Sequence, residues 1–362
     1  MKILRNYVLR ELSYPLVMSV ITLTFIFLLG NIIKIADLVL NRGVDFFGLM
    51  KFLGLLIPEM LIFTLPTSVL ASILLVFGNF SQNNEVIALN SHGINPFRVM
   101  LPVMVMGIIC SIFVLVLTDQ VVPRYSFASR KMIKKLFVKD PFAYIKPGIP
   151  LKTANGYVFL AREVGKHELR NVTVYQPQEN KPTRTIIAER CEVIRLKGDT
   201  KIKIRLYNGT IDEPDSEDAQ VFNKLDFQVY ELPLLDLENI EKLGKKTKEY
   251  SIDELIRFLK EPDLPPDKRR EYLVEIHKKI SFSLGCFVFT IIGLPIAIIT
   301  RRGNMLVSFG LAIMVLTVYY VLYSWVQALA IQGLLPPQIA LWIPSMLFFI
   351  VGVILMYKVI RS

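Results

Sequence analysis

Long stretches of this chain lack any charged side chain. None occurs between Glu11 and Lys34, and none occurs from Gly303 to Tyr357. Charged residues make up only 20% of the sequence, hydrophobic residues 53%, and the mean hydropathy is +0.46. The core helices of soluble domains are shorter and carry a polar face. Runs of this length without charge therefore exclude an ordinary soluble protein.

The charge-free runs have the length of membrane spans. A bilayer core needs about 20 apolar residues per helix. The last run is long enough for two helices, and Gln332-Gly-Leu-Leu-Pro-Pro-Gln338 is the expected break between them. The sequence therefore predicts six transmembrane helices, in the runs 12–33, 60–78, 99–118 and 280–300 and in the two halves of 303–357.

The chain is also poor in cysteine and in signal-peptide features. The first apolar run is longer than a usual signal-peptide core and no A-x-A-like site follows it, so we expect it to remain as an anchor. Cys110 and Cys286 lie in predicted spans, which leaves Cys191 without a partner for a disulfide in the polar segment. No Cys-x-x-Cys or similar spacing is present, so no metal site is expected.

Motifs for catalysis are missing as well. Gly244-Lys-Lys-Thr lacks the upstream glycine and the Ser/Thr after the lysine that a P-loop needs. There is no His-Glu-x-x-His, and Glu59 is the only acid near the interior of a predicted span, whereas an intramembrane aspartyl protease needs two. We expect no catalytic residues and no cofactor in this chain.

The net charge of +11 follows in part from the orientation below, so it does not require nucleic acid as a partner.

The distribution of Lys and Arg predicts the orientation, because cytoplasmic loops are enriched in both. The stretch 2–10, the loops 79–98 and 300–304 and the C-terminus carry basic residues, whereas the loop 332–338 has none. Both termini are therefore expected in the cytoplasm and the polar segment outside. The predicted domains are 1–120 with spans one to three, 121–276 outside, and 277–362 with spans four to six.

The outer segment has the pattern of an antiparallel β domain followed by a helical linker. Gln176-Pro, Lys197-Gly-Asp and Asn208-Gly are candidate turns, and regularly spaced short strands are typical of a sandwich or a jelly roll. Ser251-Ile-Asp-Glu then predicts a capped helix start, and a charged helix at 267–279 leads into the fourth span. The predicted strands are 156–161, 172–175, 184–188, 192–196, 201–206 and 225–230.

The loop 79–98 is patterned more strongly than a plain connection needs. Ser81 or Asn83 can begin a helix at about 82–92 and Gly93 can end it. Glu85 is an isolated acid on this helix, and a carboxylate there can make a charge-assisted contact with an arginine of a cytoplasmic ATPase. The alternative is a connecting turn in which Glu85 is simply solvated.

Basic residues also lie at the outer ends of the first and third spans. Lys34 ends span one, and Arg130, Lys131 and Lys134 follow span three. A charge beside the membrane is costly enough to suggest a function, and cations at the outer surface suit a lipid that carries phosphates. The alternative is snorkelling of these side chains to ordinary anionic headgroups. The N-terminal stretch 5–11 is interpreted as a short interfacial anchor.

Together these features resemble the LptF/LptG family of lipopolysaccharide export permeases over nearly the whole chain. The loop and span-four stretches are the most specific, and the soluble insert contributes little to the resemblance. The stretches that carry it are RNYVLREL, IIKIADL, IPEMLIFTLPTSVL, NNEVIALNSHGIN, VVPRYSFASR and EIHKKISFSLGCFVFTIIGLPIAI.

The resemblance implies a permease subunit of an ABC exporter in the bacterial inner membrane, with a periplasmic β-jellyroll domain. Such a subunit extracts lipopolysaccharide and passes it to a periplasmic jellyroll bridge protein. Its other implied partners are a cytoplasmic ABC ATPase dimer, which uses the ATP, and a second homologous permease subunit or a second copy of the chain. The resemblance implies that Glu85 is the ATPase-coupling glutamate, and Val86, Leu89 and His92 of the same helix are predicted to act with it. It also implies lipid-binding cations at Lys34 and Arg130, and Lys131 and Lys134 are predicted to act beside them.

A membrane signalling or mechanotransmission protein with an extracytoplasmic sensor domain is the alternative interpretation. It would use a similar layout with an ATPase or kinase partner inside. It would not need a lipid-lined cavity or cations beside the outer surface, so bound lipid would distinguish the two. Whether the chain is of the F or the G type stays open.

Overall fold

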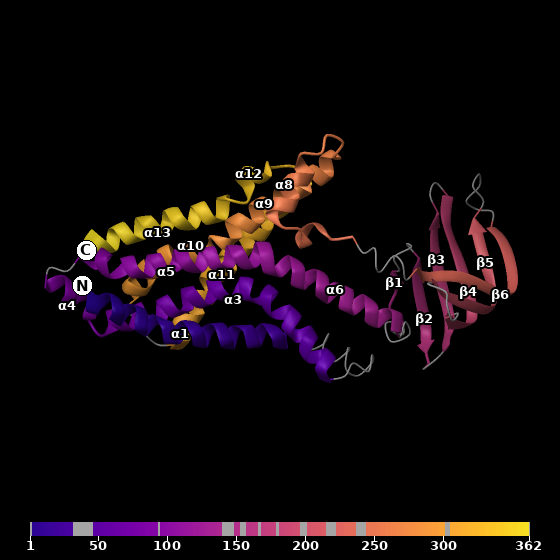
Figure 1. The fold of residues 1–362 in the computed structure, drawn as a ribbon, viewed down its shortest axis with the longest axis horizontal. Coiled ribbons are helices and arrows are strands. Elements are labelled where there is room, and N and C mark those ends of the chain that lie inside the picture. The colour runs from indigo at the N-terminus through magenta and orange to yellow at the C-terminus, as the bar shows by residue number, and fades with distance from the viewer. Residues whose placement is uncertain are drawn as a thin grey trace. The chain divides into compact units, whose positions relative to one another are not determined.

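The computed structural model describes residues 2–31, 46–92, 95–139, 148–152, 157–165, 168–178, 181–195, 201–214, 222–236, 244–300 and 305–361. The chain divides into two compact units (Figure 1). One, called here the helical unit, comprises 1–32, 51–127 and 245–362, and the other comprises 33–50 and 128–244.

Six helical segments of the described chain are long and apolar enough to cross a membrane, which confirms the predicted number. Most of the described residues of the charge-free runs lie within these segments, because hydrocarbon tolerates only a backbone whose hydrogen bonds are satisfied internally. In chain order they are α1 (Lys2–Leu29); α3 (Phe46–Gln82); α5 (Pro96–Val116), continued by the π-helix η1 (Leu117–Val121) and α6 (Val122–Lys139); α9 (Pro266–Ser283) with α10 (Gly285–Thr300); α11 (Met305–Gln332); and α12 (Pro337–Ala340) with α13 (Ile343–Arg361).

The fourth span is the centre of the helical unit. Its apolar stretch is 72% buried, against 11% for the first span. Neighbouring helices approach α10 closely at two glycines, since a Cβ on Gly107 would collide with Thr290 and one on Gly352 would come within 2.9 Å of the Ile291 side chain. Small residues at such crossings let membrane helices pack tightly. The apolar surface of α1 is left largely uncovered by the rest of the described chain.

Three short helices connect these spans: α4 (Glu85–Ser91), the 3₁₀ turn η3 (Thr247–Glu249) and α8 (Ile252–Leu259). The start of α8 is as predicted. The hydroxyl of Ser251 accepts a hydrogen bond from the backbone N–H of Glu254, and the Glu254 carboxylate accepts one from the N–H of Ser251. This reciprocal pair satisfies two of the backbone donors that a helix start leaves open.

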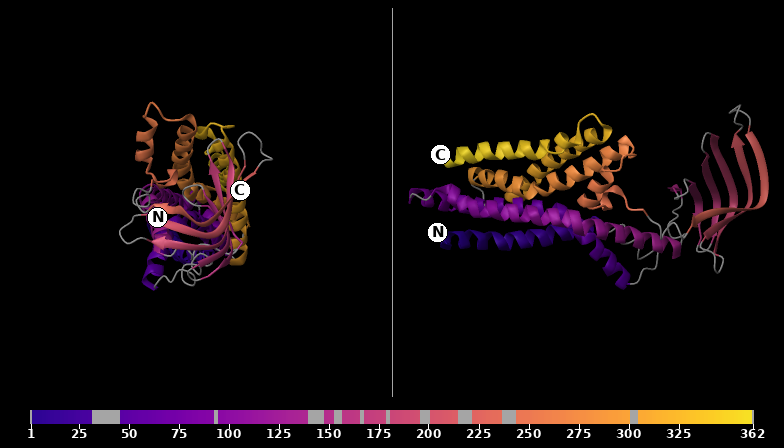
Figure 2. Two further views of the ribbon diagram at one scale, coloured as in Figure 1. Left: turned by 90° about the vertical axis from the view of Figure 1, so that its right-hand side faces the viewer. Right: turned by 45° about the horizontal axis from the view of Figure 1, so that its top comes forward.

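The second unit contains a six-stranded antiparallel sheet whose strands follow one another in sequence order (Figure 2). Sequence neighbours pair with each other, which is the topology of a meander, so the β domain is confirmed and its jelly-roll form is not. The predicted strands 184–188 and 192–196 are one strand. The strands are β1 (Leu151–Lys152), β2 (Val158–Val164), β3 (Glu168–Gln178), β4 (Lys181–Arg195), β5 (Lys201–Pro214) and β6 (Phe222–Asp236).

Two predicted turns are wrong, because both lie inside strands. Gln176-Pro is part of β3, where the register with β4 shifts between Gln176 and Gln178. Asn208-Gly is part of β5, where Asn208 has a φ of 46° and a Cβ on Gly209 would collide with the carbonyl oxygen of Ile187. Both pairs of residues bend the backbone, and here they bend it within a paired strand. The third predicted turn, at 197–199, lies outside the described residues.

A line of irregular positions crosses the sheet. The β3–β4 register passes from Arg170–Arg190 to Val172–Ala188, and the β4–β5 register skips the position between Ala188 and Arg190 in the same way. Asn171 and Asn208, on this line, both have left-handed φ values, which asparagine tolerates better than most residues. Buried apolar residues from both sides of the line form one cluster. Cys191 lies in it as a free thiol, and burial raises its pKa to about 12.

Candidate functional site

The short helix α4 lies at the same end of the helical unit as both chain termini, called here the terminal end (Figure 1). Its first residue, Glu85, accepts a hydrogen bond of 3.4 Å from the hydroxyl of Tyr7 in α1. The Tyr7 ring stacks on Phe80, the two centroids being 5.5 Å apart. The N-terminal stretch therefore does more than anchor the chain at the interface, because it also positions the predicted coupling carboxylate.

The structure places the predicted coupling residues in different surroundings. Leu89 packs against the core of the helical unit, and the His92 ring nitrogen Nδ1 lies 2.7 Å from the carbonyl oxygen of Ala88. Ile87, which the sequence reasoning left out of the set, is 45% exposed. A helical wheel could have indicated this, since residues two apart point to opposite sides of a helix. Val86 lies in α4, but its side chain is not among those described.

At the opposite end of the helical unit, a buried ion pair joins three elements. Asp119 lies in the π-helix η1 and accepts a hydrogen bond of 2.6 Å from the backbone N–H of Ile252, the first residue of α8. The Lys279 ammonium is 3.7 Å from the Asp119 carboxylate and donates to the carbonyl oxygen of Tyr250. The Lys279 side chain is only 2% exposed. The linker before α9 is thus tied to the third and fourth spans by charge-assisted hydrogen bonds.

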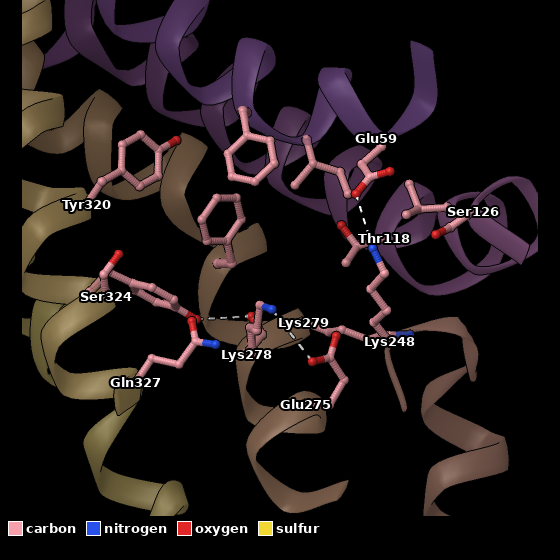
Figure 3. Close-up of a pocket in the computed structure, with 15 residues that line it drawn as sticks. Glu59, Thr118, Ser126, Lys248, Glu275, Lys278, Lys279, Tyr320, Ser324 and Gln327 are labelled. Carbon is pink, nitrogen blue, oxygen red and sulfur yellow. Dashed lines mark hydrogen bonds and ion pairs between the residues drawn. The ribbon is translucent and has the colours of Figure 1, made fainter. Parts of the chain in front are cut away.

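A pocket of about 250 Å³ lies beside this ion pair, between the second, third, fourth and fifth spans (Figure 3). One wall is aromatic. Phe282 makes an edge contact with Phe63 at 5.4 Å and stacks on Tyr320 at 5.8 Å between centroids. We call this space the aromatic pocket. Its apolar wall can accept a hydrocarbon chain, because aromatic side chains offer a large apolar surface.

The mouth of the aromatic pocket is ionic. Lys248 reaches toward Glu59 with an N–O distance of 3.5 Å, and Lys278 pairs with Glu275 at 3.6 Å (Figure 3). Both lysines are partly solvated whereas Lys279 is buried, so these two cations can change partners more easily than Lys279 can. Within the part of the chain that the structure describes, no group of three His, Cys, Asp or Glu could hold a metal. The arrangement suits binding of an amphiphile with a charged headgroup better than bond-breaking chemistry.

The predicted lipid-binding cations are only partly visible. Arg130 lies in α6, and its guanidinium donates a hydrogen bond of 2.7 Å to the carbonyl oxygen of Gly244, within the second unit. Lys131 is half-buried. Lys34 lies outside the described residues, and of Lys134 only the place in α6 is described. Their meeting at one lipid headgroup therefore stays a prediction.

Sequence reasoning missed Asp119, Lys248 and Lys279. A signal for two of them existed, since Asp119 directly follows the third apolar run and Lys279 directly precedes the fourth. Opposite charges at the ends of two neighbouring spans can pair if the ends lie at the same level. That pairing depends on how the helices pack, which the spacing of residues in the sequence does not show.

Six helical segments long and apolar enough to span a membrane, a β domain between the third and fourth of them and an amphiphilic pocket fit a membrane transport subunit. The comparison with protein families agrees. The sequence model of the family described as "Lipopolysaccharide export system permease LptF/LptG" matches residues 6–358, and the chain belongs to this family. The protein is thus a lipopolysaccharide export permease at the family level, a multi-pass protein of the inner membrane and a transporter subunit that is not itself an enzyme.

Individual relatives are distant. The lipopolysaccharide export system permease protein LptF of Escherichia coli K12 is 18% identical over 362 residues, which cover 98% of this chain and 94% of the relative. LptG of the same strain is 23% identical over 168 residues, covering 46% of this chain and 47% of the relative. Protein RP871 of Rickettsia prowazekii is 19% identical over 311 residues, 82% of each chain. Similarity to both LptF and LptG leaves the subunit type open.

Proposed function

We propose that this chain is one half of a lipopolysaccharide exporter that a separate cytoplasmic ABC ATPase dimer drives. The other half is a homologous permease subunit or a second copy of the chain. In this proposal the terminal end of the helical unit faces the cytoplasm and the β domain lies in the periplasm. The exporter extracts lipopolysaccharide from the inner membrane, and the β domain passes it to a periplasmic jellyroll bridge protein.

The observation that carries the proposal is the construction of α4. It is a helix of seven residues between two spans, with Glu85 held at its start by Tyr7 and with the apolar side chain of Ile87 exposed. A partner that binds Ile87 and pairs an arginine with Glu85 would grip α4 by an apolar and a charge-assisted contact. Movement of the partner would then be passed directly to α3 and α5, which α4 connects.

The opposite end supplies surfaces suited to the lipid. The aromatic pocket can hold part of an acyl chain, and Lys248 and Lys278 at its mouth can exchange their long contacts with Glu59 and Glu275 for phosphate oxygens. Independently of this pocket, Lys34, Arg130, Lys131 and Lys134 are proposed to bind phosphates of lipopolysaccharide. Cations that hold a phosphate gain about 1.5–3 kcal/mol for each charge-assisted contact.

Isolation of the intact complex from its native membrane tests this function. Mass spectrometry of the purified complex should find an ABC ATPase, a homologous permease subunit or excess of this chain, and bound lipopolysaccharide. ATP turnover of the complex should respond to added lipopolysaccharide. A kinase partner and no bound lipopolysaccharide would overturn the proposal in favour of a sensor protein.

The site of lipid binding can be tested separately in cells. A photo-crosslinking residue at position 34 or 130 should capture lipopolysaccharide. A crosslinker at position 229 samples an exposed residue of β6, in the domain that the proposal places later on the route of the lipid. Capture at 229 but at neither 34 nor 130 would mean that these cations are ordinary headgroup anchors.

A further inference from the structure

A second groove lies at the terminal end of the helical unit, between the start of α1 and the start of α5. Its volume is about 210 Å³. It brings together one end of each helix, so that residues almost 100 positions apart in sequence form one surface. We call it the basic groove, and the residues used below are Lys2, Arg5, Val8, Arg98, Val99 and Leu101.

The charge of the basic groove is entirely positive. Lys2, Arg5 and Arg98 line it, and its lining includes no acidic residue. Among the described residues none of these three cations is in an ion pair, and the Arg5 guanidinium only reaches the side-chain oxygen of Asn6, at 3.4 and 3.5 Å. The aromatic pocket differs, because Glu59 and Glu275 face its lysines. Three like charges around one groove repel each other, and a bound anion would remove that repulsion.

The floor and rim of the basic groove are apolar. Val8 and Val99 are buried beneath it, and Leu101 at its rim is 48% exposed. A small inorganic anion would use the cations and leave this apolar surface in water. A phospholipid would use both, with its phosphate on the cations and the first part of an acyl chain on the leucine. Basic pockets between membrane helices are a known form of headgroup recognition.

We propose that the basic groove binds the headgroup of an anionic phospholipid of the surrounding bilayer. The phosphate lies among Lys2, Arg5 and Arg98, and the glycerol and upper acyl chain lie along Leu101. The lipid acts here as a bound component of the protein and not as the exported substrate. This proposal requires that the protein lies in the inner membrane. It does not require an ATPase partner or a particular route of lipopolysaccharide.

The position of the groove gives the lipid an effect on α4. Val8 and Val99 also line a neighbouring cavity of about 230 Å³, whose lining includes Tyr7 and Glu85. A lipid that fixes the start of α1 against α5 therefore also fixes Tyr7, which holds Glu85. We expect the bound lipid to protect both the start of α1 and α4 from hydrogen exchange.

The test uses the purified full-length protein, with whatever partners it retains, in nanodiscs of phosphatidylcholine with or without phosphatidylglycerol. Native mass spectrometry should detect a retained phosphatidylglycerol. Lys2→Gln/Arg5→Gln/Arg98→Gln should weaken its binding by about tenfold or more, the factor expected for loss of a charge-assisted contact. Hydrogen exchange in residues 2–10 and 85–91 should rise in parallel.

The matched control is Arg10→Gln/Lys358→Gln/Arg361→Gln. It removes the same charge from the same end of the unit and leaves the lining of the groove intact. The control should keep the bound lipid, and equal loss in both triple variants would overturn the site in favour of general surface attraction. Arg98→Lys, which keeps the charge, should retain binding and serves if the triple variant folds poorly. Displacement of the lipid by inorganic phosphate or glycerol phosphate at comparable concentration would overturn the lipid assignment.

Discussion

The two ends of the helical unit are built on different principles. At the end that carries Asp119, the described residues form five ion pairs. Three of them join different segments of the chain, namely Lys245–Glu254, Lys248–Glu59 and Lys279–Asp119, and the other two, Arg270–Asp267 and Lys278–Glu275, lie within α9. At the terminal end the described residues form no ion pair, and aromatic and aliphatic contacts position α4. One end uses its charges internally, whereas the other leaves them for whatever binds there.

Burial explains why the difference matters. Taking two charges out of water costs several kcal/mol for each ion, and their attraction offsets this only when further hydrogen bonds satisfy both groups. Asp119 and Lys279 have those bonds, from the N–H of Ile252 and to the carbonyl of Tyr250. Such an arrangement is rigid, because any displacement leaves a charge without a partner. The cations of the terminal end stay in water and can change partners at little cost.

The largest expected effect is on the buried pair. Lys279→Met should lower the free energy of unfolding by about 3–5 kcal/mol, because it leaves Asp119 charged and partly buried without its cation. Thermal unfolding of the detergent-solubilised protein measures this. Lys278→Met is the control, since Lys278 is 35% exposed and its pair with Glu275 lies within one helix, so a loss under about 1 kcal/mol is expected there. Equal losses in the two variants would mean that the burial of Lys279 adds nothing to the strength of its ion pair.

The second prediction concerns α4. Glu85→Lys should disconnect the permease from its ATPase, at a cost of about 2–5 kcal/mol at the interface, because it replaces an attractive charge by a repulsive one. Stability should change little, since Glu85 makes only one hydrogen bond of 3.4 Å within the chain. Pull-down of the ATPase and lipid-stimulated turnover measure the effect. Ser91→Lys adds a positive charge at the exposed end of the same helix, and it should retain most binding.

A smaller effect is expected at Tyr7. Tyr7→Phe keeps the ring that stacks on Phe80 and removes the hydroxyl that donates to Glu85. Loss of one hydrogen bond to a charged group at the surface should weaken ATPase binding by about 0.5–1.5 kcal/mol. In Tyr7→Phe combined with Glu85→Gln, the tyrosine substitution should cost less than it does alone. Additive losses in this cycle would mean that Tyr7 does not act through Glu85.

The smallest effect is a pH dependence confined to the ion-paired end. Burial alone would raise the pKa of Glu254, but the hydrogen bonds from Lys245 and from the Ser251 backbone outweigh it and hold the pKa below the ordinary 4.5. A lowered pKa stabilises the fold above the unfolded value, and this contribution is lost as the pH falls through the folded value. Hydrogen exchange in 245–260, expressed relative to the intrinsic exchange rate at each pH, should therefore rise below pH 4.5. The rise should be smaller in Lys245→Gln, and an unchanged profile in that variant would argue against the ion pair as its cause.

Much of the fold could be predicted, because membrane spans and helix caps both need particular residues close together in the sequence. The charge-free runs locate the spans, and Ser251 with Glu254 locates the start of α8. The predictions that failed concern residues whose local sequence suggests one structure but whose contacts with distant residues produce another. Asn208-Gly looks like a turn, but β4 and β6 pair on both sides of it and keep it within a strand. Asp119 looks like the first residue of a soluble segment until α8 and α9 bring Ile252 and Lys279 to it. Of the predicted coupling set, Glu85 lies where a partner can reach it, and Leu89 is used by the core.

The π-helix at Leu117–Val121 makes the third span sensitive to the deletion of a single residue. A π turn accommodates one residue more than an α turn, and each residue of a helix turns the chain by about 100°. Removing a single residue there would restore an ordinary helix and rotate Asp119 away from Ile252 and Lys279, while every apolar residue of the span stayed apolar. Such a deletion would leave the hydropathy of the span almost unchanged, yet Lys279 would be buried without its partner. The span would insert normally, and the defect would show only when the helices assemble.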